Sequence, residues 1–89
     1  PARGDKRPTL HAEVGLADKV EFWIYNIAGE LVHRAELDGR QVIAVEGRYA
    51  YEYAWDVSNI ASGIYLYVIK AEKAGERALT AMKKLAVIK

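Results

Sequence analysis

The sequence contains no cysteine among its 89 residues. Disulfide bonds, thiolate metal sites and thiol nucleophiles are therefore excluded, and the fold has to be stabilised by burial alone. Proline is also scarce, with two residues, both within the first eight positions. Long apolar runs are missing as well. Because a membrane-spanning helix needs roughly eighteen or more consecutive apolar residues, we expect no membrane span.

Neither sign of charge is in excess, since thirteen Lys and Arg residues against twelve Asp and Glu residues give a net charge of +1. Both signs are spread along the chain, which lacks the basic footprint that a phosphate backbone requires. We therefore expect no nucleic-acid partner. The small local excess at Lys83, Lys84 and Lys89 is typical of an edge strand whose lysines hinder pairing with other sheets.

The length of the chain allows one hydrophobic core and leaves no room for a second lobe. Many enzymes with two substrates or a cofactor build their clefts between lobes or layers, so this length favours a binding, scaffolding or targeting module over an enzyme. Residues 1–8 contain both prolines and four charged residues. We interpret residues 1–8 as a linker and residues 9–89 as a single domain.

Short segments that alternate apolar and polar residues dominate the sequence after Pro8, and this period of two is the pattern of half-buried β-strands. Sustained helical periodicity is missing. The spacing predicts an all-β protein, an antiparallel β-sandwich of six to seven strands. We expect strands over residues 9–14, 19–27, 30–37, 49–55, 64–72 and 78–88, while residues 42–45 fit either a strand or part of a connection.

An aromatic stripe marks one predicted strand, because Tyr49, Tyr51, Tyr53 and Trp55 alternate with small or acidic residues. Such a stripe normally faces a core. The predicted core consists mainly of Leu10, Val20, Phe22, Ile24, Val32, Tyr53, Trp55, Tyr65, Tyr67, Leu85 and Val87.

Three stretches, VEFWIYNIAGELV, YAWDVSNIASGIYLYVI and KKLAVIK, contain a characteristic order of residues. With them the sequence resembles a group of C-terminal modules of secreted bacterial proteins. The group includes the immunoglobulin-like module of the flagellar hook-capping protein and the C-terminal sorting domains of type IX secretion cargo. The resemblance implies an immunoglobulin-like or fibronectin-III-like sandwich. The matching positions are Ile24, Tyr25, Asn26, Gly29, Val32, Trp55, Asp56, Ser62, Gly63, Ile64 and Tyr65.

The resemblance also implies a function, that of a non-catalytic C-terminal module acting in secretion, sorting or surface attachment. The implied partners are an upstream domain of the same parent chain and the secretion machinery. The implied location is extracellular or at the cell surface, after export through the periplasm of a Gram-negative-type bacterium. The short VSNIA loop is closer to sorting domains, whereas Trp55 is closer to hook-capping modules, so both subfamilies stay open.

An alternative function is a structural or carbohydrate-binding accessory domain that packs against a neighbouring catalytic domain. Its glycan contacts would come from exposed aromatic residues such as Trp23, Tyr49 and Tyr51. Stacking on sugars requires exposed and roughly coplanar rings, whereas a place in the core requires buried ones, so burial distinguishes the two roles.

The stretch from Trp55 to Gly63 has the composition of a structural corner rather than of a catalytic loop. We expect short side chains such as Asp56 and Asn59 to accept hydrogen bonds from nearby backbone N–H groups. Gly29 and Gly63 are expected to take positive φ where strands reverse. Asp56 and Asn59 offer too few oxygens for calcium, which binds six to eight.

The remaining chemical signals are weak. His11 and His33 lie on different predicted strands, without a third ligand or a nucleophile that would complete a zinc or hydrolase site. The Arg3-Gly4-Asp5 tripeptide is a common chance match. We therefore assign no catalytic, cofactor-binding or metal-binding residue.

Two predicted strands are apolar on both faces, which a sandwich strand with one solvated face does not require. In strand 19–27, Trp23, Tyr25 and Ile27 alternate with Val20, Phe22 and Ile24. We expect the first set to form an exposed surface that a neighbour covers, and the isolated module to form a weak homodimer through it without needing Trp23 for its stability. The predicted interface residues are Trp23, Tyr25, Ile27, Lys83, Lys84 and Lys89.

Overall fold

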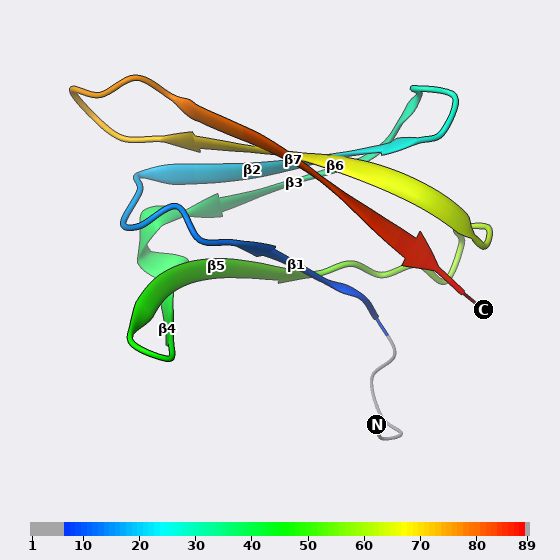
Figure 1. Ribbon diagram of the computed structural model, residues 1–89, viewed down its shortest axis with the longest axis horizontal. Helices are drawn as coiled ribbons and strands as arrows, with labels where there is room; N and C mark the ends of the chain where they lie inside the picture. The colour runs from blue at the N-terminus through cyan, green and yellow to red at the C-terminus, as the bar shows by residue number, and fades with distance from the viewer. Residues whose placement is uncertain (1–6, 89) are drawn as a thin grey trace.

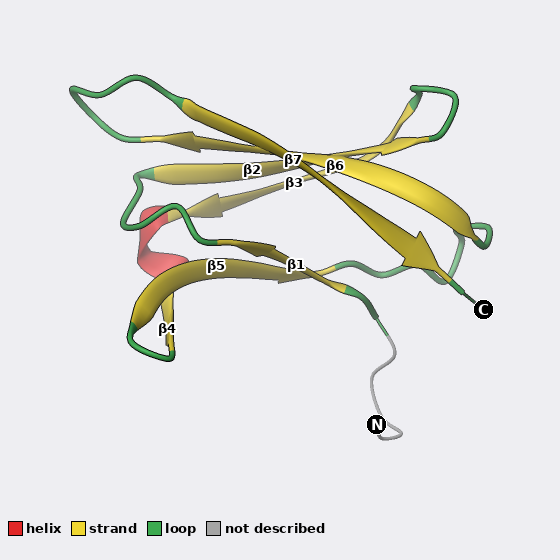
Figure 2. Cartoon of the chain, in the orientation of Figure 1, coloured by secondary structure: helices red, strands yellow, loops and turns green. Residues whose placement is uncertain are grey.

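The computed structural model describes residues 7–88, which form two antiparallel sheets packed face to face (Figure 1; Figure 2). The predicted all-β sandwich is confirmed, and the segment that the sequence left open is a strand, β4. The one helix of the described residues is a single 3-10 turn, η1. The elements are β1 (Thr9–Ala12), β2 (Lys19–Asn26), β3 (Leu31–Asp38), η1 (Gly39–Gln41), β4 (Ile43–Val45), β5 (Arg48–Ala54), β6 (Gly63–Glu72) and β7 (Leu79–Val87).

The strands divide between the sheets as in immunoglobulin-like sandwiches. One sheet has the order β1-β5-β4 and the other the order β3-β2-β6-β7. The hairpins β2–β3 and β6–β7 stay within the four-stranded sheet, whereas the connections β1–β2, β3–β4 and β5–β6 cross between sheets. The register of β2 against β6 runs without a shift from Lys19 opposite Glu72 to Asn26 opposite Tyr65. The two central strands, β2 and β6, thus place the EFWIYN and GIYLYVI sequences side by side.

The core lies between the two sheets, and most of its predicted members are buried. Val32, Tyr53 and Leu85 are only partly buried and pack against the margin of the core. Leu85 belongs to the edge strand β7, and Val32 lies where the β2–β3 register shifts. The fully buried large side chains are Trp55, Tyr51, Phe22, Leu10, Ile24, Ile69 and Val20.

The aromatic stripe of β5 is not uniformly buried, which corrects the expectation for that strand. Tyr51 is 0% exposed and Trp55 1% exposed, whereas Tyr49 is 52% exposed. Tyr49 lies at the end of β5 that pairs with the three-residue β4, opposite Ala44. The stripe therefore faces the core only over the later part of β5.

Candidate functional site

The turn between β2 and β3 is organised by one asparagine. Asn26 Oδ1 accepts hydrogen bonds from the backbone N–H groups of Ala28 (3.0 Å) and Glu30 (2.9 Å), and Asn26 Nδ2 donates to Glu30 Oε1 (2.8 Å). Gly29 has a φ of 87°, a left-handed conformation that glycine adopts without a Cβ clash. Asn26 and Gly29 therefore fix the geometry of the hairpin and with it the position of Ile27 at its tip.

The segment between β5 and β6 is a corner held by side-chain hydrogen bonds to the backbone. Asp56 Oδ1 accepts from the N–H of Ser58 at 3.0 Å, which forms an Asx turn. The Tyr65 hydroxyl donates to the carbonyl oxygen of Ala61 at 2.7 Å, the arrangement called a tyrosine corner. Trp55 packs edge-on against Tyr65, with ring centroids 5.5 Å apart and ring planes at 81°. These contacts make the segment structural.

Gly63 behaves differently from the expectation. It does not take positive φ, and it begins β6 in an extended conformation opposite Val87. A Cβ built at Gly63 would meet only Tyr65 Cε1, at 3.9 Å. The chain reverses before this residue, in the corner itself, so the left-handed conformation is not needed at Gly63.

The outer face of the four-stranded sheet, which points away from the three-stranded sheet, has Trp23 at its centre. Arg34 Cζ lies 5.0 Å and Lys70 Nζ 4.4 Å from the centroid of the indole ring. These residues come from β3 and β6, the strands on either side of β2. The indole Nε1–H donates to Glu21 Oε1 at 3.2 Å. Trp23 is therefore half-buried by its own neighbours.

Glu21 is the buried charged residue of the described chain, at 7% exposure. Burial raises its pKa, but the hydrogen bonds from Trp23 and Arg34, with the nearby charges of Arg34 and Lys19, outweigh this effect and hold the pKa below its ordinary value. Arg34 forms a short ion pair with the same carboxylate. Because a buried charge without partners is strongly destabilising, the charged form of Glu21 depends on its contacts with Trp23 and Arg34.

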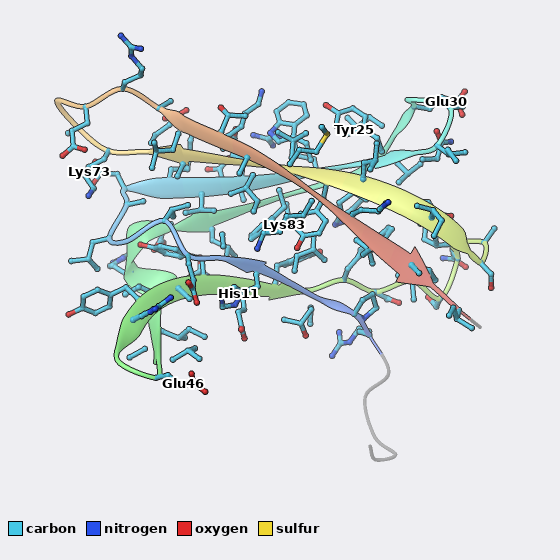
Figure 3. All side chains as sticks on the ribbon, viewed as in Figure 1. His11, Tyr25, Glu30, Glu46, Lys73 and Lys83 are labelled. Carbon is cyan, nitrogen blue, oxygen red and sulfur yellow. The ribbon has the colours of Figure 1, made fainter. Side chains whose placement is uncertain are left out.

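The two described lysines of the predicted interface, Lys83 and Lys84, lie on opposite sides of β7. Lys83 pairs with Tyr67 on the inner side, and its Nζ donates to the carbonyl oxygen of His11 in β1 at 3.2 Å (Figure 3). Lys84 pairs with Leu66 on the outer side. The third predicted residue, Lys89, lies outside the described residues.

The family model of the secretion system C-terminal sorting domain matches residues 8–87, which include all seven strands, the β2–β3 turn and the corner between β5 and β6. The chain belongs to this family. Members of the family are sorting signals of larger exported proteins, in the type IX secretion system, and are not catalytic domains. No curated protein and no solved structure matches this sorting domain.

The outer face of the sorting domain ends in an apolar hollow of about 520 Å³ beside the β2–β3 turn. Ile27 at the turn is 83% exposed, and Ile64 at the start of β6 is 44% exposed. Tyr25, also on the outer face, is half-buried and points away from the three-stranded sheet (Figure 3). Contiguous exposed apolar surface of this kind usually marks an interaction site. The hollow is lined by Ile27, Ile64, Leu66, Lys84, Leu85 and Ala86.

His11 lies in a charged cluster on the three-stranded sheet. Its Nδ1 is 2.8 Å from Glu52 Oε2 and its Nε2 is 3.2 Å from Glu13 Oε2, while Arg48 Nη1 lies 3.4 Å from Glu13 Oε1. The contact with Glu52 is the main reason why the pKa of His11 is raised, and Glu13 adds to it. Both ring nitrogens are therefore engaged within the domain.

His33 lies outside that cluster and packs against Tyr53 and Trp55 at the margin of the core. Its Nε2 is 2.8 Å from the Tyr53 hydroxyl, and its ring also lies near Trp55, with centroids 6.1 Å apart. Within residues 7–88, no group of three or more His, Cys, Asp or Glu side chains is arranged to hold a metal ion. In the same part of the chain, no helix is long and apolar enough to cross a membrane. The Arg3-Gly4-Asp5 tripeptide lies outside the described residues.

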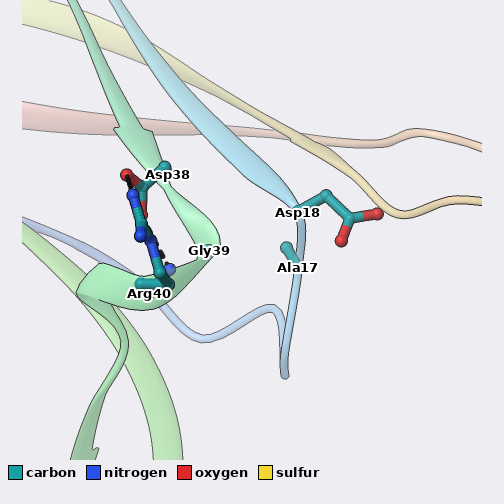
Figure 4. A pocket seen from close by; sticks show the side chains of 5 residues that line it. All are labelled: Ala17, Asp18, Asp38, Gly39 and Arg40. Carbon is teal, nitrogen blue, oxygen red and sulfur yellow. Dashed lines mark hydrogen bonds and ion pairs between the residues drawn. The ribbon is translucent and has the colours of Figure 1, made fainter.

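A polar hollow lies between η1 and the segment before β2, and the charged side chains that line it take part in structural bonds (Figure 4). Asp38 Oδ1 accepts from the N–H of Arg40 at 2.8 Å, and Asp38 Oδ2 lies 3.3 Å from Arg40 Nη2. Asp18 points away from this pair and accepts from the N–H of Ala74 at 2.6 Å. A Cβ at Gly39 would lie 2.1 Å from the carbonyl oxygen of Ala17, so only glycine fits there. Both carboxylates are thus used to hold loops in place.

The three aromatic residues named for glycan contacts do not share a surface. Tyr51 is fully buried, and its hydroxyl donates to the carbonyl oxygens of Ala17 and Gly39, each at 3.1 Å. Tyr49 lies on the three-stranded sheet and Trp23 on the other. A stacking platform made of these three rings is therefore excluded.

Sequence reasoning missed two residues, Glu21 and Tyr51, as centres of polar contacts. The signal for Glu21 was its position on the same strand face as Trp23 and two residues from it. The signal for Tyr51 was weaker, because its partners Ala17 and Gly39 are recognisable only after the chain has folded.

Proposed function

We propose that this sorting domain is the export signal of a larger secreted or surface protein and that the type IX machinery reads its outer face and β7. The cargo would cross the periplasm of a Gram-negative-type bacterium before release or surface attachment. The observation that carries the proposal is the family match over residues 8–87.

The distribution of burial supports the outer face as the recognised surface. The inner faces of both sheets pack against each other in the core. On the outer face of the four-stranded sheet, Arg34 and Lys70 lie over Trp23 and cover the centre of that face. The hollow at Ile27 and Ile64 is an apolar part of the outer face that stays accessible beside β7. A partner that binds over this hollow would bury its apolar surface, which contributes about 25 cal/mol of favourable free energy per Å² of apolar area.

The test is to append residues 1–89 to a periplasm-directed reporter in a type IX-competent bacterium. We expect the reporter to reach the cell surface or the medium. Ile27→Lys and Ile64→Lys should leave it in the periplasm, because a charge in the hollow opposes apolar docking. The matched control is Ile43→Lys, at a residue 40% exposed on β4 of the other sheet, which should be exported normally.

Retention of the unmodified fusion in the periplasm would remove the sorting role and leave the fold unaffected. Normal export of both hollow variants would instead show that the machinery does not use this surface.

A further inference from the structure

The four edge strands of the sandwich are not equally protected against pairing with another strand. β1 and β4 have only four and three residues. β3 has eight, but its pairing with β2 contains a register shift, and its Arg34 and Glu36 form an ion pair. Short strands, irregularities and charges are the usual means of blunting an edge. Three of the four edges in the described residues are therefore poor templates.

β7 is the exception. It has nine residues, pairs with β6 without a register shift, and is exposed along its first six positions. Its exposed apolar side chains include Met82, at 66% exposure, and Leu79, at 57%. A long, regular and partly apolar edge of this kind is a ready template for an added strand, because its outward backbone N–H and C=O groups have no partner strand.

The centre of β7 also has an uncompensated positive charge. Lys83 and Lys84 are consecutive, and β7 contains no acidic residue. None of the ion pairs among residues 7–88 includes either lysine, and the hydrogen-bond acceptor of Lys83 is the neutral carbonyl of His11. Because neighbouring strand residues point to opposite faces, one cation lies on each side of the edge.

We propose that β7 binds an extended segment of a partner protein by strand addition, and that this segment has two consecutive acidic residues flanked by apolar ones. One carboxylate lies beside Lys83 on the inner side and the other beside Lys84 on the outer side. The flanking apolar residues lie beside Met82 and beside Ala86, of which Ala86 lines the hollow. Backbone hydrogen bonds supply the affinity, and the charge pair sets register and partner choice. This inference rests on the proposed function, for which it names the mode of recognition.

A second copy of the domain fits this edge poorly. Antiparallel pairing of two β7 strands over their full length, about a two-fold axis, places Lys83 of one copy opposite Lys83 of the other. Like charges directly opposite each other destabilise a strand pair. Lys83 thus opposes self-pairing, and both lysines favour an acidic strand, so the charge of β7 acts against one partner and for another.

The experiment uses isotope-labelled residues 1–89 and a synthetic peptide of about nine residues, a typical strand length, in which valine and threonine alternate around two central glutamates. We expect slowed hydrogen exchange at alternate amides of β7, since alternate N–H groups face the edge. A peptide with central glutamines should bind roughly fivefold weaker at low salt, because two cross-strand charge pairs of about 0.5 kcal/mol each contribute about 1 kcal/mol together.

Two controls separate strand addition from charge attraction. N-methylation of alternate peptide amides in one of the two possible phases should abolish binding, while methylation in the other phase should be tolerated. Lys84→Gln should weaken binding, and Lys73→Gln, in the β6–β7 turn, should not.

Three results would overturn the inference: no binding at millimolar peptide, binding without protection of β7 amides, or dimers of the domain paired through β7. Export of the reporter fusion together with any of these results would leave the sorting function standing and remove only strand addition. Failure of the fusion to be exported would count against the sorting function itself.

Discussion

The inner and outer faces of the four-stranded sheet are made by the same strands, yet only one of them is a core. Val20, Phe22 and Ile24 are each 0% exposed on the inner face, because the three-stranded sheet covers them. Trp23 and Tyr25, which alternate with them, stay half-buried on the outer face. Both rows have the apolar and aromatic pattern of a buried face. The pattern shows that a face needs covering, but it does not show what covers it.

The outer face is itself divided into a covered and an uncovered part. Around Trp23, long cationic side chains lie over the ring and shield it from water. At the other end, Ile27 and Ile64 have no such cover from residues 7–88. We propose that the centre stabilises the sheet and that the uncovered end binds a partner.

The largest expected difference between the faces comes from the inner tryptophan. Trp55→Ala should lower the free energy of unfolding by about 3–5 kcal/mol, because it removes a fully buried ring and leaves a cavity. Trp55 is 1% exposed and contacts both Tyr65 and His33. Urea denaturation measures the change. A loss below about 1 kcal/mol would show that the ring is not a core residue.

The outer tryptophan should have a smaller effect of a different kind. Trp23→Phe keeps an aromatic ring but removes the N–H donor to buried Glu21, which should cost about 1–2 kcal/mol. The expectation from sequence alone, that replacing Trp23 leaves stability unchanged, is revised accordingly. In a Glu21→Leu background the same substitution should cost less than about 0.5 kcal/mol, and equal costs in both backgrounds would exclude the coupling.

The pH dependence of stability should be weaker still. The pKa of His11 is raised above its ordinary value of about 6.5 by Glu52 and Glu13, so its contribution is fully present below that value and is lost as the pH rises through the folded pKa. The loss should stay below about 1 kcal/mol, because the partners are partly exposed. Denaturation at a series of pH values tests this, and His11→Gln should flatten the profile over that window.

The smallest effect on stability is expected at the uncovered end of the outer face. Ile27→Lys should change the free energy of unfolding by less than about 0.5 kcal/mol, since Ile27 is 83% exposed. It should, however, suppress the weak homodimer that we predict for the isolated domain, because a lysine cannot be buried there without a partner. Sedimentation across a concentration series compares the two proteins. A strictly monomeric parent would remove the self-association prediction and leave the hollow for the upstream domain or the secretion machinery.

Much of the architecture could be predicted from local sequence. Period-two alternation located the strands, and Gly29 indicated a turn because glycine chemistry acts over a few residues, whereas the hydrogen bonds of Asn26 in that turn were found only in the structure. Asp56 was predicted as a turn acceptor. The errors occur where local rules are insufficient. Gly63 needs no positive φ, and Tyr49 is exposed although it belongs to the same alternating row as the core-facing Tyr51.

The sequence by itself determined the all-β class, most of the core and the sorting-domain motifs, because alternation and turn chemistry are properties of neighbouring residues. Only the tertiary structure decided that Glu21 is buried under Trp23 and Arg34, and that β7 is a longer and more regular edge than β1, β3 and β4. The physical reason is that these features depend on strand order and register. Pairing of residues far apart in the chain sets both, and no local pattern specifies them.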